Sequence, residues 1–323
     1  MTALPVSVIT GFLGSGKTTL LSRLLRDPAF ERTAVIINEF GAVGLDHLLV
    51  ESSDEQILML EGGCVCCTVR GDLVRTAGDL LARRAAGTVT AFERIVIETT
   101  GLADPAPVVH ALMTDHGLAD GLRLESVIAT VDAVAGAATL DAHPQSVKQA
   151  ALADCIVVTK SDLADPAANG LAERLEALNP AATKLTAVHG VVDATRLFHA
   201  RAHYDPPFLD APAHRDAGIN TFCLRRKEPL HAVTLSLFLQ VVAEHCGARL
   251  LRLKGLVDVV ESPGRPAVIH GVQHVFHPPA WLDAWPDEDR STRIVVISQG
   301  LEAGWLQNLL ELLDEEVSAC SIS

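Results

Sequence analysis

A phosphate-binding loop near the start of the chain constrains the fold more than any other feature. Residues Gly11–Thr18 have the sequence GFLGSGKT, which fills every position of the pattern G-x-x-x-x-G-K-[ST]. An apolar run, Val6–Thr10, precedes this loop, and a stretch with helical periodicity, Thr18–Leu25, follows it. Because the motif works only between a strand and a helix, this setting predicts a βα unit that binds the phosphates of a nucleoside triphosphate.

Apolar runs alternate with Ala/Leu-rich helical stretches up to residue 202, such as Asp72–Ala86 and Ala167–Leu178. Continuous apolar strands separated by helices predict a parallel sheet covered on both faces. We therefore expect residues 1–202 to form a P-loop NTPase domain with a doubly wound, mostly parallel α/β sheet. Its expected strands are Val6–Thr10, Ala34–Ile37, Ile57–Leu60, Ile95–Glu98, Ser126–Val131, Cys155–Thr159 and Thr183–Val188.

The pattern changes after residue 202. Residues 203–216 contain three prolines among polar residues, which predicts an interdomain linker. Residues 217–323 are expected to form a smaller α+β domain. Its expected elements are a strand at Gly218–Arg225, a helix at Leu230–Cys246, short strands up to Val275, a strand near Thr292–Ser298 and a helix at Leu301–Leu313.

Composition narrows the classes of partner and the compartment. A formal net charge of −14 argues against nucleic acids and anionic membranes, which bind basic surfaces. No apolar segment is long enough to span a bilayer, and the first residues enter a strand without a charged-then-apolar leader. We therefore expect a cytoplasmic protein. The seven cysteines are then expected to be reduced, and a local cluster of them favours metal binding or redox chemistry over a disulfide.

The residues of the phosphate-binding loop have distinct expected roles. Backbone N–H groups of Gly14–Thr18 are expected to surround the β-phosphate, aided by the dipole of the following helix. Lys17 would bridge β- and γ-phosphate oxygens, and the Thr18 hydroxyl would ligate Mg²⁺. The full set of expected nucleotide contacts in this loop is Gly11, Gly14, Ser15, Gly16, Lys17, Thr18 and Thr19.

A carboxylate, Glu98, ends one of the expected strands and opens the sequence ETTG, Glu98–Gly101. The carboxyl edge of a strand beside a phosphate-binding loop is where a Mg²⁺-holding acidic residue belongs. Glu98 is therefore expected to hold Mg²⁺ or one of its water molecules. The N–H of Gly101 is placed to sense the γ-phosphate. Lys17 and Glu98 are the candidate catalytic residues that these motifs provide.

The choice of base depends on the sequence Thr159–Asp162, TKSD, which directly follows an apolar run. An ionised Asp accepts hydrogen bonds only, and guanine offers two adjacent donors where adenine offers an acceptor. Asp162 would therefore select guanine, with the stem of Lys160 covering one face of the ring. The alternative is a Lys-Ser-Asp turn that merely starts a helix, since Ser and Asp are good helix-start residues. The position after a strand favours GTP.

Three cysteines lie within the sequence GGCVCC, Gly62–Cys67. Thiolates suit Zn²⁺, Co²⁺ and related ions, and three of them leave one coordination position open, which favours transfer over permanent storage. In an extended segment Cys64 and Cys66 point to one side and Cys67 to the other, so all three converge only if the backbone folds around the metal. Buried structural cysteines or a redox switch are the alternatives. Cys155, Cys223, Cys246 and Cys320 are interpreted as ordinary core or surface residues.

Together these motifs resemble the CobW-type family of P-loop GTPases, over nearly the whole chain. The matching segments are Thr10–Leu20 (TGFLGSGKTTL), Asn38–Gly41 (NEFG), Gly62–Cys67 (GGCVCC), Glu98–Pro105 (ETTGLADP), Val131–Ala133 (VDA), Thr159–Leu163 (TKSDL), Leu250–Gly255 (LLRLKG), Trp285–Pro286 and Arg293–Ile297.

The resemblance implies a GTP-dependent metal chaperone or insertase that serves a client metalloprotein or metal-insertion enzyme. It also implies a switch segment at residues 38–46, in which Glu39 and Asp46 contribute to Mg²⁺, to water positioning or to coupling with the cysteines. The chain departs from the family pattern at Ala42, where many members have an acidic residue, and at Thr159, where Asn is usual. The histidine-rich stretch that many members carry is absent.

These expectations combine into one hypothesis. GTP and Mg²⁺ order the switch segment and the cysteine loop, so that Cys64, Cys66 and Cys67 hold Zn²⁺ or Co²⁺; hydrolysis to GDP then releases the metal to the client. No arginine finger is evident, so slow intrinsic hydrolysis is expected. A redox-sensing regulatory GTPase and a small-molecule kinase are the alternatives. Zinc and cobalt both fit the ligands, and a homo-oligomer is left open.

Overall fold

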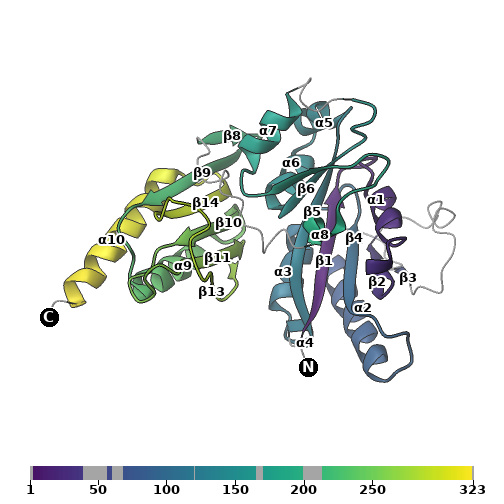
Figure 1. Cartoon of the computed structure of the whole chain (residues 1–323), viewed down its shortest axis with the longest axis horizontal. Helices are drawn as coiled ribbons and strands as arrows, with labels where there is room; N and C mark the ends of the chain where they lie inside the picture. The colour runs from purple at the N-terminus through teal and green to yellow at the C-terminus, as the bar shows by residue number, and fades with distance from the viewer. Residues whose placement is uncertain are drawn as a thin grey trace. The chain divides into compact units, whose positions relative to one another are not determined.

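The structure is a computed structural model that describes residues 3–38, 57–59, 68–119, 121–164, 170–198 and 213–321. The chain folds into two compact units. Unit 1 comprises Met1–Ala172 and Ala182–His203, and unit 2 comprises Glu173–Ala181 and Tyr204–Ser323. Each unit has its own sheet and its own hydrophobic core (Figure 1).

Unit 1 is built on a seven-stranded sheet in the order β3-β2-β4-β1-β5-β6-β7, and every neighbouring pair is parallel. The strand order reverses on either side of β1, because β2 to β4 lie on one side and β5 to β7 on the other. The expected doubly wound parallel sheet is therefore confirmed. The strands are β1 (Leu4–Gly11), β2 (Thr33–Asn38), β3 (Ile57–Met59), β4 (Arg94–Thr99), β5 (Leu122–Asp132), β6 (Cys155–Thr159) and β7 (Thr183–Thr186).

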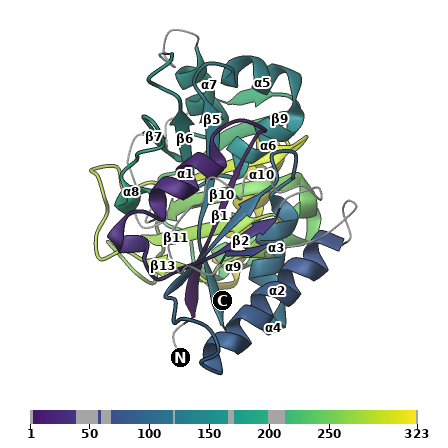
Figure 2. The ribbon, with the colours of Figure 1, turned by 90° about the vertical axis from the view of Figure 1, so that its right-hand side faces the viewer.

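Helices cover both faces of this sheet, which is why its central strands are continuously apolar. Helices α1 and α8 pack on one face around Ile9, Val96 and Ile128. Helices α3, α4 and α6 contact β5 on the opposite face, and α2 packs on α3 and α4 (Figure 2). The helices of unit 1 are α1 (Lys17–Leu24), α2 (Thr68–Ala85), α3 (Ala106–Thr114), α4 (His116–Ala119), α5 (Gly136–Ala142), α6 (Pro144–Leu152) and α8 (Ala194–Phe198), with a short 3-10 turn at Pro28–Phe30.

Unit 2 contains an antiparallel sheet in the order β12-β11-β10-β14-β9-β8, with β13 paired to β11. Helices α9 (Ala232–Cys246) and α10 (Ala303–Ser321) pack together and cover a core that includes Phe238, Val296 and Leu306. The expected smaller α+β domain is therefore confirmed. Its strands are β8 (His214–Asp216), β9 (Ile219–Arg226), β10 (Leu250–Val257), β11 (Ala267–Val272), β12 (Val275–Phe276), β13 (Ala280–Trp281) and β14 (Thr292–Gln299), with a 3-10 turn at Gly247–Arg249.

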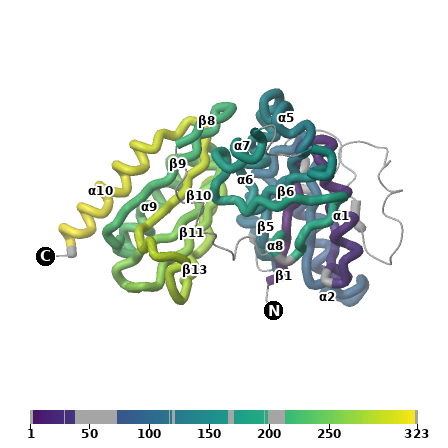
Figure 3. The backbone as a smooth tube through the Cα atoms, turned by 45° about the horizontal axis from the view of Figure 1, so that its top comes forward, coloured from purple at the N-terminus to yellow at the C-terminus, as the bar shows by residue number. Residues whose placement is uncertain are grey.

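Helix α7 (Leu171–Leu178) precedes β7 in the chain, yet residues 173–181 are part of unit 2. Two hydrogen bonds, from Nε at 2.7 Å and from Nη2 at 3.0 Å, join Arg174 to the two carboxylate oxygens of Asp216. The end of the segment is held by Thr221 Oγ1, which donates to Leu178 O, and by Lys254 Nζ, which donates to Ala181 O. Figure 3 shows α7 next to β8. These polar contacts explain why the helix groups with a sheet that lies later in the sequence.

Among the helices that the structure describes, none is both long and apolar enough to cross a membrane.

Candidate nucleotide-binding site

The candidate site lies where four neighbouring strands of unit 1 end. The phosphate-binding loop follows β1, the ETTG sequence spans the end of β4, Asp132 ends β5, and the TKSD sequence spans the end of β6. Because the strand order reverses at β1, this edge is the topological switch point at which open α/β sheets bind ligands.

The phosphate-binding loop is held tightly against β5. Gly11 has φ +142°, and a Cβ at that position would lie 2.5 Å from the carbonyl oxygen of Thr130. The hydroxyls of Ser15 and Thr130 share a hydrogen bond of 2.6 Å, and Ser15 N donates to Phe12 O. Gly11 is therefore required both for its backbone conformation and for the close approach to β5.

Helix α1 begins directly after this loop, at Lys17. The first N–H groups of an α-helix have no carbonyl partner within the helix, so a helix start suits an anion. The side chain of Lys17 is buried, and its Nζ donates to Gly11 O at 3.0 Å and to Phe12 O at 3.2 Å. The lysine therefore bonds the carbonyls of its own loop, with its charge held at the candidate phosphate position. Thr19 is exposed on α1.

Two side-chain oxygens that could ligate Mg²⁺ lie side by side. Thr18 Oγ1 donates to Glu98 Oε1 at 2.7 Å, and the Glu98 side chain is buried at the end of β4. Hydroxyl and carboxylate oxygens are the ligands that Mg²⁺ accepts beside phosphate oxygens and water. The residues present therefore fit Mg²⁺, and Thr18 and Glu98 would hold it.

The turn after β4 rests on the phosphate-binding loop. A Cβ at Gly101 would lie 2.6 Å from the backbone N of Leu13 and 2.8 Å from its Cα, so a glycine is required there. From the other side, Gln149 Nε2 of α6 donates to Gly101 O at 3.2 Å and to Ala103 O at 3.0 Å. The turn is thus held between the loop and α6.

The TKSD sequence is joined to the phosphate-binding loop by a hydroxyl. Thr159 Oγ1 lies 2.7 Å from Ser15 O and 3.3 Å from Val131 O, and it donates to these carbonyls. Lys160 has φ +55°, and its Nζ lies 2.5 Å from Asp132 Oδ2. Thr159, which stands where Asn is usual, therefore joins the TKSD sequence to the phosphate-binding loop.

The ion pair with Lys160 affects the pKa of the Asp132 carboxyl. Burial acts to raise the pKa of the Asp132 carboxyl, but hydrogen bonds from Lys160 and from the backbone N–H groups of Val134 and Ala135 outweigh it. The pKa of Asp132 is therefore held below its usual value, and the carboxylate is ionised at neutral pH.

Asp162 lies beside the loop that follows β7. His189, with φ +50°, places Nδ1 3.5 Å from Asp162 Oδ2, and Ser161 Oγ donates to Ala187 O at 3.2 Å. Asp162 and the His189 loop therefore lie beside one another after the ends of β6 and β7.

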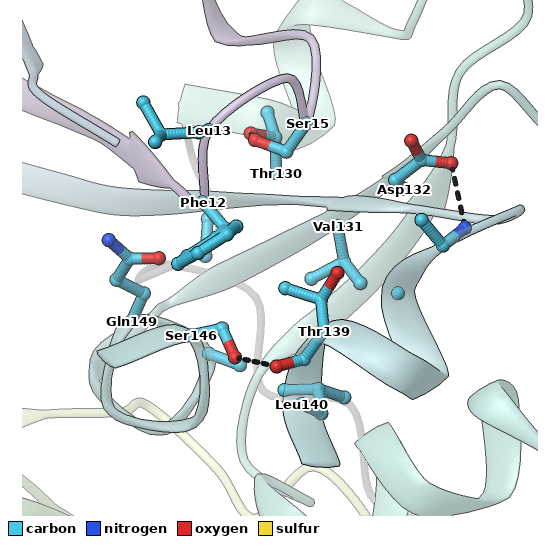
Figure 4. A pocket seen from close by; sticks show the side chains of 14 residues that line it. Phe12, Leu13, Ser15, Thr130, Val131, Asp132, Thr139, Leu140, Ser146 and Gln149 are labelled. Atoms are coloured by element: carbon cyan, nitrogen blue, oxygen red, sulfur yellow. Dashed lines mark hydrogen bonds between the residues drawn. The ribbon is translucent and has the colours of Figure 1, made fainter. Parts of the chain in front are cut away.

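A small pocket of about 40 Å³ lies on the α6 side of the phosphate-binding loop. It is lined by residues of the loop, of β5 and of helices α5 and α6, among them Phe12, Thr130, Thr139, Ser146 and Gln149 (Figure 4). The ring of Phe12 stacks on His143, which precedes α6, with 4.3 Å between the ring centroids. The residue before α6 thus contacts the phosphate-binding loop, and Gln149 of α6 contacts the ETTG turn.

Two family models match this chain. The CobW/HypB/UreG nucleotide-binding domain matches residues 5–186, and the cobalamin synthesis protein CobW C-terminal domain matches residues 219–313. The first match alone covers more than half of the chain. The chain belongs to the CobW family.

Two curated CobW-family proteins are similar along most of their length. The zinc chaperone YjiA of Escherichia coli is 31% identical over 99% of this chain and 98% of its own. The zinc chaperone CobW of Pseudomonas aeruginosa is 33% identical over 95% of this chain and 90% of its own. The crystal structure of zinc(II)-bound YjiA GTPase from Escherichia coli is similar with a TM-score of 0.74 and 27% identity, covering 97% of this chain and 99% of that one. The predicted family is therefore confirmed.

Part of the predicted site of this CobW-family protein lies outside the described residues. Glu39 and Asp46 of the expected switch segment and the cysteines Cys64, Cys66 and Cys67 all fall there. The four cysteines that the structure describes form no disulfide: Cys155 and Cys246 are buried, Cys223 is half-buried and Cys320 is exposed. Burial raises the pKa of the Cys223 thiol to about 11, so this thiol is unreactive at neutral pH.

Three residues of the site were not predicted from the sequence. Asp132 ends an apolar strand in the same way as Glu98, so a signal for it was present. His189 follows the last strand of the sheet and carries no motif. Gln149 lies in an Ala-rich helix, where a glutamine is usually exposed, and only the three-dimensional structure reveals its contacts.

Proposed function

We propose that this CobW-family protein is a GTPase whose nucleotide state controls the binding of a metal ion, Zn²⁺ or Co²⁺, and its delivery to a client protein. The observation that carries the GTP assignment is the Thr159–Ser15 hydrogen bond, because it makes the TKSD sequence and the phosphate-binding loop parts of one site. Within that site Asp162 can accept the two donors of guanine. Two relatives named zinc chaperones support the assignment of the cargo.

In this proposal each described residue has a defined task. Lys17 and the N–H groups at the start of α1 bind the β- and γ-phosphates, and Lys17 exchanges its bonds to Gly11 and Phe12 for phosphate oxygens. Thr18 and Glu98 hold Mg²⁺, which neutralises charge on the phosphates. The Gly101 turn contacts the γ-phosphate and relaxes after hydrolysis. Glu39 and Asp46 are proposed as further ligands or water-positioning groups.

The cargo would be held by Cys64, Cys66 and Cys67. Thiolate ligands suit Zn²⁺ and Co²⁺, and a three-ligand site keeps one position for a ligand of the client. The nucleotide can change the affinity for the metal only as much as the metal changes the affinity for GTP, because the coupling is reciprocal. The affinity for GTP with and without bound metal is therefore a second measurement that tests the proposal.

The test is competitive Zn²⁺ and Co²⁺ binding in Mg²⁺ with GTPγS, GDP or no nucleotide. We expect the tightest binding with GTPγS, and we expect it to be lost in the Cys64→Ser/Cys66→Ser/Cys67→Ser variant. A Cys155→Ser/Cys223→Ser/Cys246→Ser variant is the matched control, because it removes the same number of thiols from positions outside the proposed metal site. Equal affinity in every nucleotide state would contradict the proposal.

Asp162→Asn tests the nucleotide part in the same assay. Xanthine has a carbonyl where guanine has its amine, so an amide side chain can donate to it. We expect this variant to lose the effect of GTP on metal binding and to regain it with XTP. A variant that still responds to GTP as the wild type does would remove Asp162 from the base pocket.

A further inference from the structure

Gln149 makes contacts that its position in the fold does not require. It lies in α6, and its side chain is 1% exposed. Both of its hydrogen bonds go to one turn, because Nε2 donates to Gly101 O at 3.2 Å and to Ala103 O at 3.0 Å. A single buried amide therefore fixes the carbonyls of the turn that rests on the phosphate-binding loop.

The other half of the same amide is unsatisfied. Among the described residues Gln149 Oε1 is buried without a hydrogen-bond partner, and Gln149 lines the small pocket beside the loop. In Figure 4 this oxygen points toward Phe12. The amide cannot be reversed, because Oε1 would then face two carbonyl oxygens. Leaving a buried carbonyl oxygen unpaired costs stability, so the unpaired Oε1 does not explain why a glutamine stands here. What the glutamine adds is its pair of bonds to the turn.

The turn is also constrained from the side of the phosphate-binding loop. Gly101 is in contact with Leu13 so closely that no Cβ fits. A second and weaker contact from α6, Lys148 Nζ to Asp104 Oδ2 at 3.4 Å, lies at the end of the turn and is partly exposed. A turn that is already held in place loses less conformational freedom when its N–H groups meet a phosphate, which strengthens binding of that phosphate.

We propose that Gln149 is the positioning residue of the γ-phosphate-sensing turn, and that it thereby sets how strongly the protein distinguishes GTP from GDP. This rests on the proposed function, in which the protein binds and hydrolyses GTP. Gln149 touches neither nucleotide nor metal; it acts through Gly101 and Ala103. GDP has no γ-phosphate, so its affinity does not depend on Gln149.

The test compares Gln149→Met, which keeps the length of the side chain but removes both donors, with Gln145→Met. Gln145 is exposed in the same helix, so it is a control for the substitution itself. In Mg²⁺ we would measure the dissociation constants of GDP and GTPγS, the single-turnover rate of GTP hydrolysis and the melting temperature. We expect GDP affinity within about twofold of wild type, and a loss of about tenfold in GTPγS affinity and in hydrolysis rate, as one to two net hydrogen bonds predict. Gln145→Met should match the wild type.

A second variant tests the loss of the hydrogen-bond donor without a change in side-chain shape. Gln149→Glu conserves the shape of the side chain, but its ionised form cannot donate, so its GTPγS-to-GDP ratio should fall at least as far. An unchanged ratio of GTPγS to GDP affinity in either folded variant would overturn the inference. Equal losses of GDP and GTPγS affinity, or unfolding of both variants, would also overturn it, because the role of Gln149 would then be purely structural. If the wild type itself fails to bind or hydrolyse GTP, the proposed function fails, and that result is seen before any variant is made.

Discussion

Thr159 illustrates at the scale of one residue how two motifs that lie far apart in the sequence become one site. Its hydroxyl donates to Ser15 O of the phosphate-binding loop, and both partners are buried. An asparagine would reach this carbonyl with an amide, whereas threonine reaches it with a shorter hydroxyl from a β-branched side chain that suits the end of a strand. In this chain a threonine hydroxyl therefore joins the two motifs.

Thr159→Val tests this bond, because it retains the branched shape and removes the donor. With Ser15 O left unpaired, the loop should lose its brace, and the affinities for GDP and GTPγS should both fall about tenfold, as expected for one buried hydrogen bond and an orphaned carbonyl. Fluorescent-nucleotide titration measures both affinities. Thr159→Ser keeps the hydroxyl and should stay close to wild type; if valine and serine behave alike, the hydroxyl is not the brace.

At the scale of elements, the helices and strands differ in how far they could be predicted. The central parts of the parallel strands β1, β4, β5 and β6 are buried on both faces, so they appear in the sequence as mostly apolar runs, and the prediction places them to within a few residues. The phosphate-binding loop was predictable because its geometry demands fixed residue types. The partners of Gln149 and of Lys254 were not, because a buried polar side chain resembles a surface residue until its tertiary contacts are known.

Helix α7 is the element whose environment the sequence did not indicate. It was expected within a domain of residues 1–202, but the contacts that hold it come from β8, β9 and β10. The spacing of apolar residues in a helix indicates which face is buried, but it does not indicate which sheet covers that face. Its grouping with unit 2 is therefore a tertiary property.

The Arg174–Asp216 pair should control the local stability of α7. Its two parallel hydrogen bonds and its partial burial make it stronger than an exposed ion pair. Asp216→Asn should raise amide hydrogen exchange across residues 171–178 by about five- to tenfold, equivalent to about 1 kcal/mol. Exchange in α1 (Lys17–Leu24) is the internal control and should not change. Unchanged exchange in α7 would show that Thr221 and Lys254 suffice to hold the helix.

At the scale of the whole molecule, the chain passes between its two compact units three times, since residues 173–181 leave unit 1 and return to it. A cut between the two matched family models therefore does not separate two independent bodies. The side chains of Arg252 and Lys254 are buried in unit 2, and Lys254 bonds to Ala181 O of the inserted segment. Removing that segment would take away the Ala181 carbonyl to which the buried Lys254 ammonium donates.

A fragment of residues 1–203 should therefore be less stable than the same residues in the full chain. Without Asp216, Thr221 and Lys254, the segment 173–181 loses the polar contacts that join it to β8, β9 and β10. We expect hydrogen exchange in residues 171–181 to approach that of an unfolded peptide, and the thermal transition to shift down by several degrees, as a loss of about 1–2 kcal/mol implies for about 200 residues. A fragment with the melting temperature and the α7 protection of the full chain would contradict this account.

The grouping of residues 173–181 with unit 2 also affects the order in which contacts can form during synthesis. Thr221 follows Leu178 by 43 residues, and Lys254 follows Ala181 by 73. As the ribosome releases the chain from its N-terminus, α7 emerges long before the strands that hold it, and β10 pairs with β14, which is made later still. Residues 173–181 therefore acquire their partners Asp216, Thr221 and Lys254 only after most of the chain has been made.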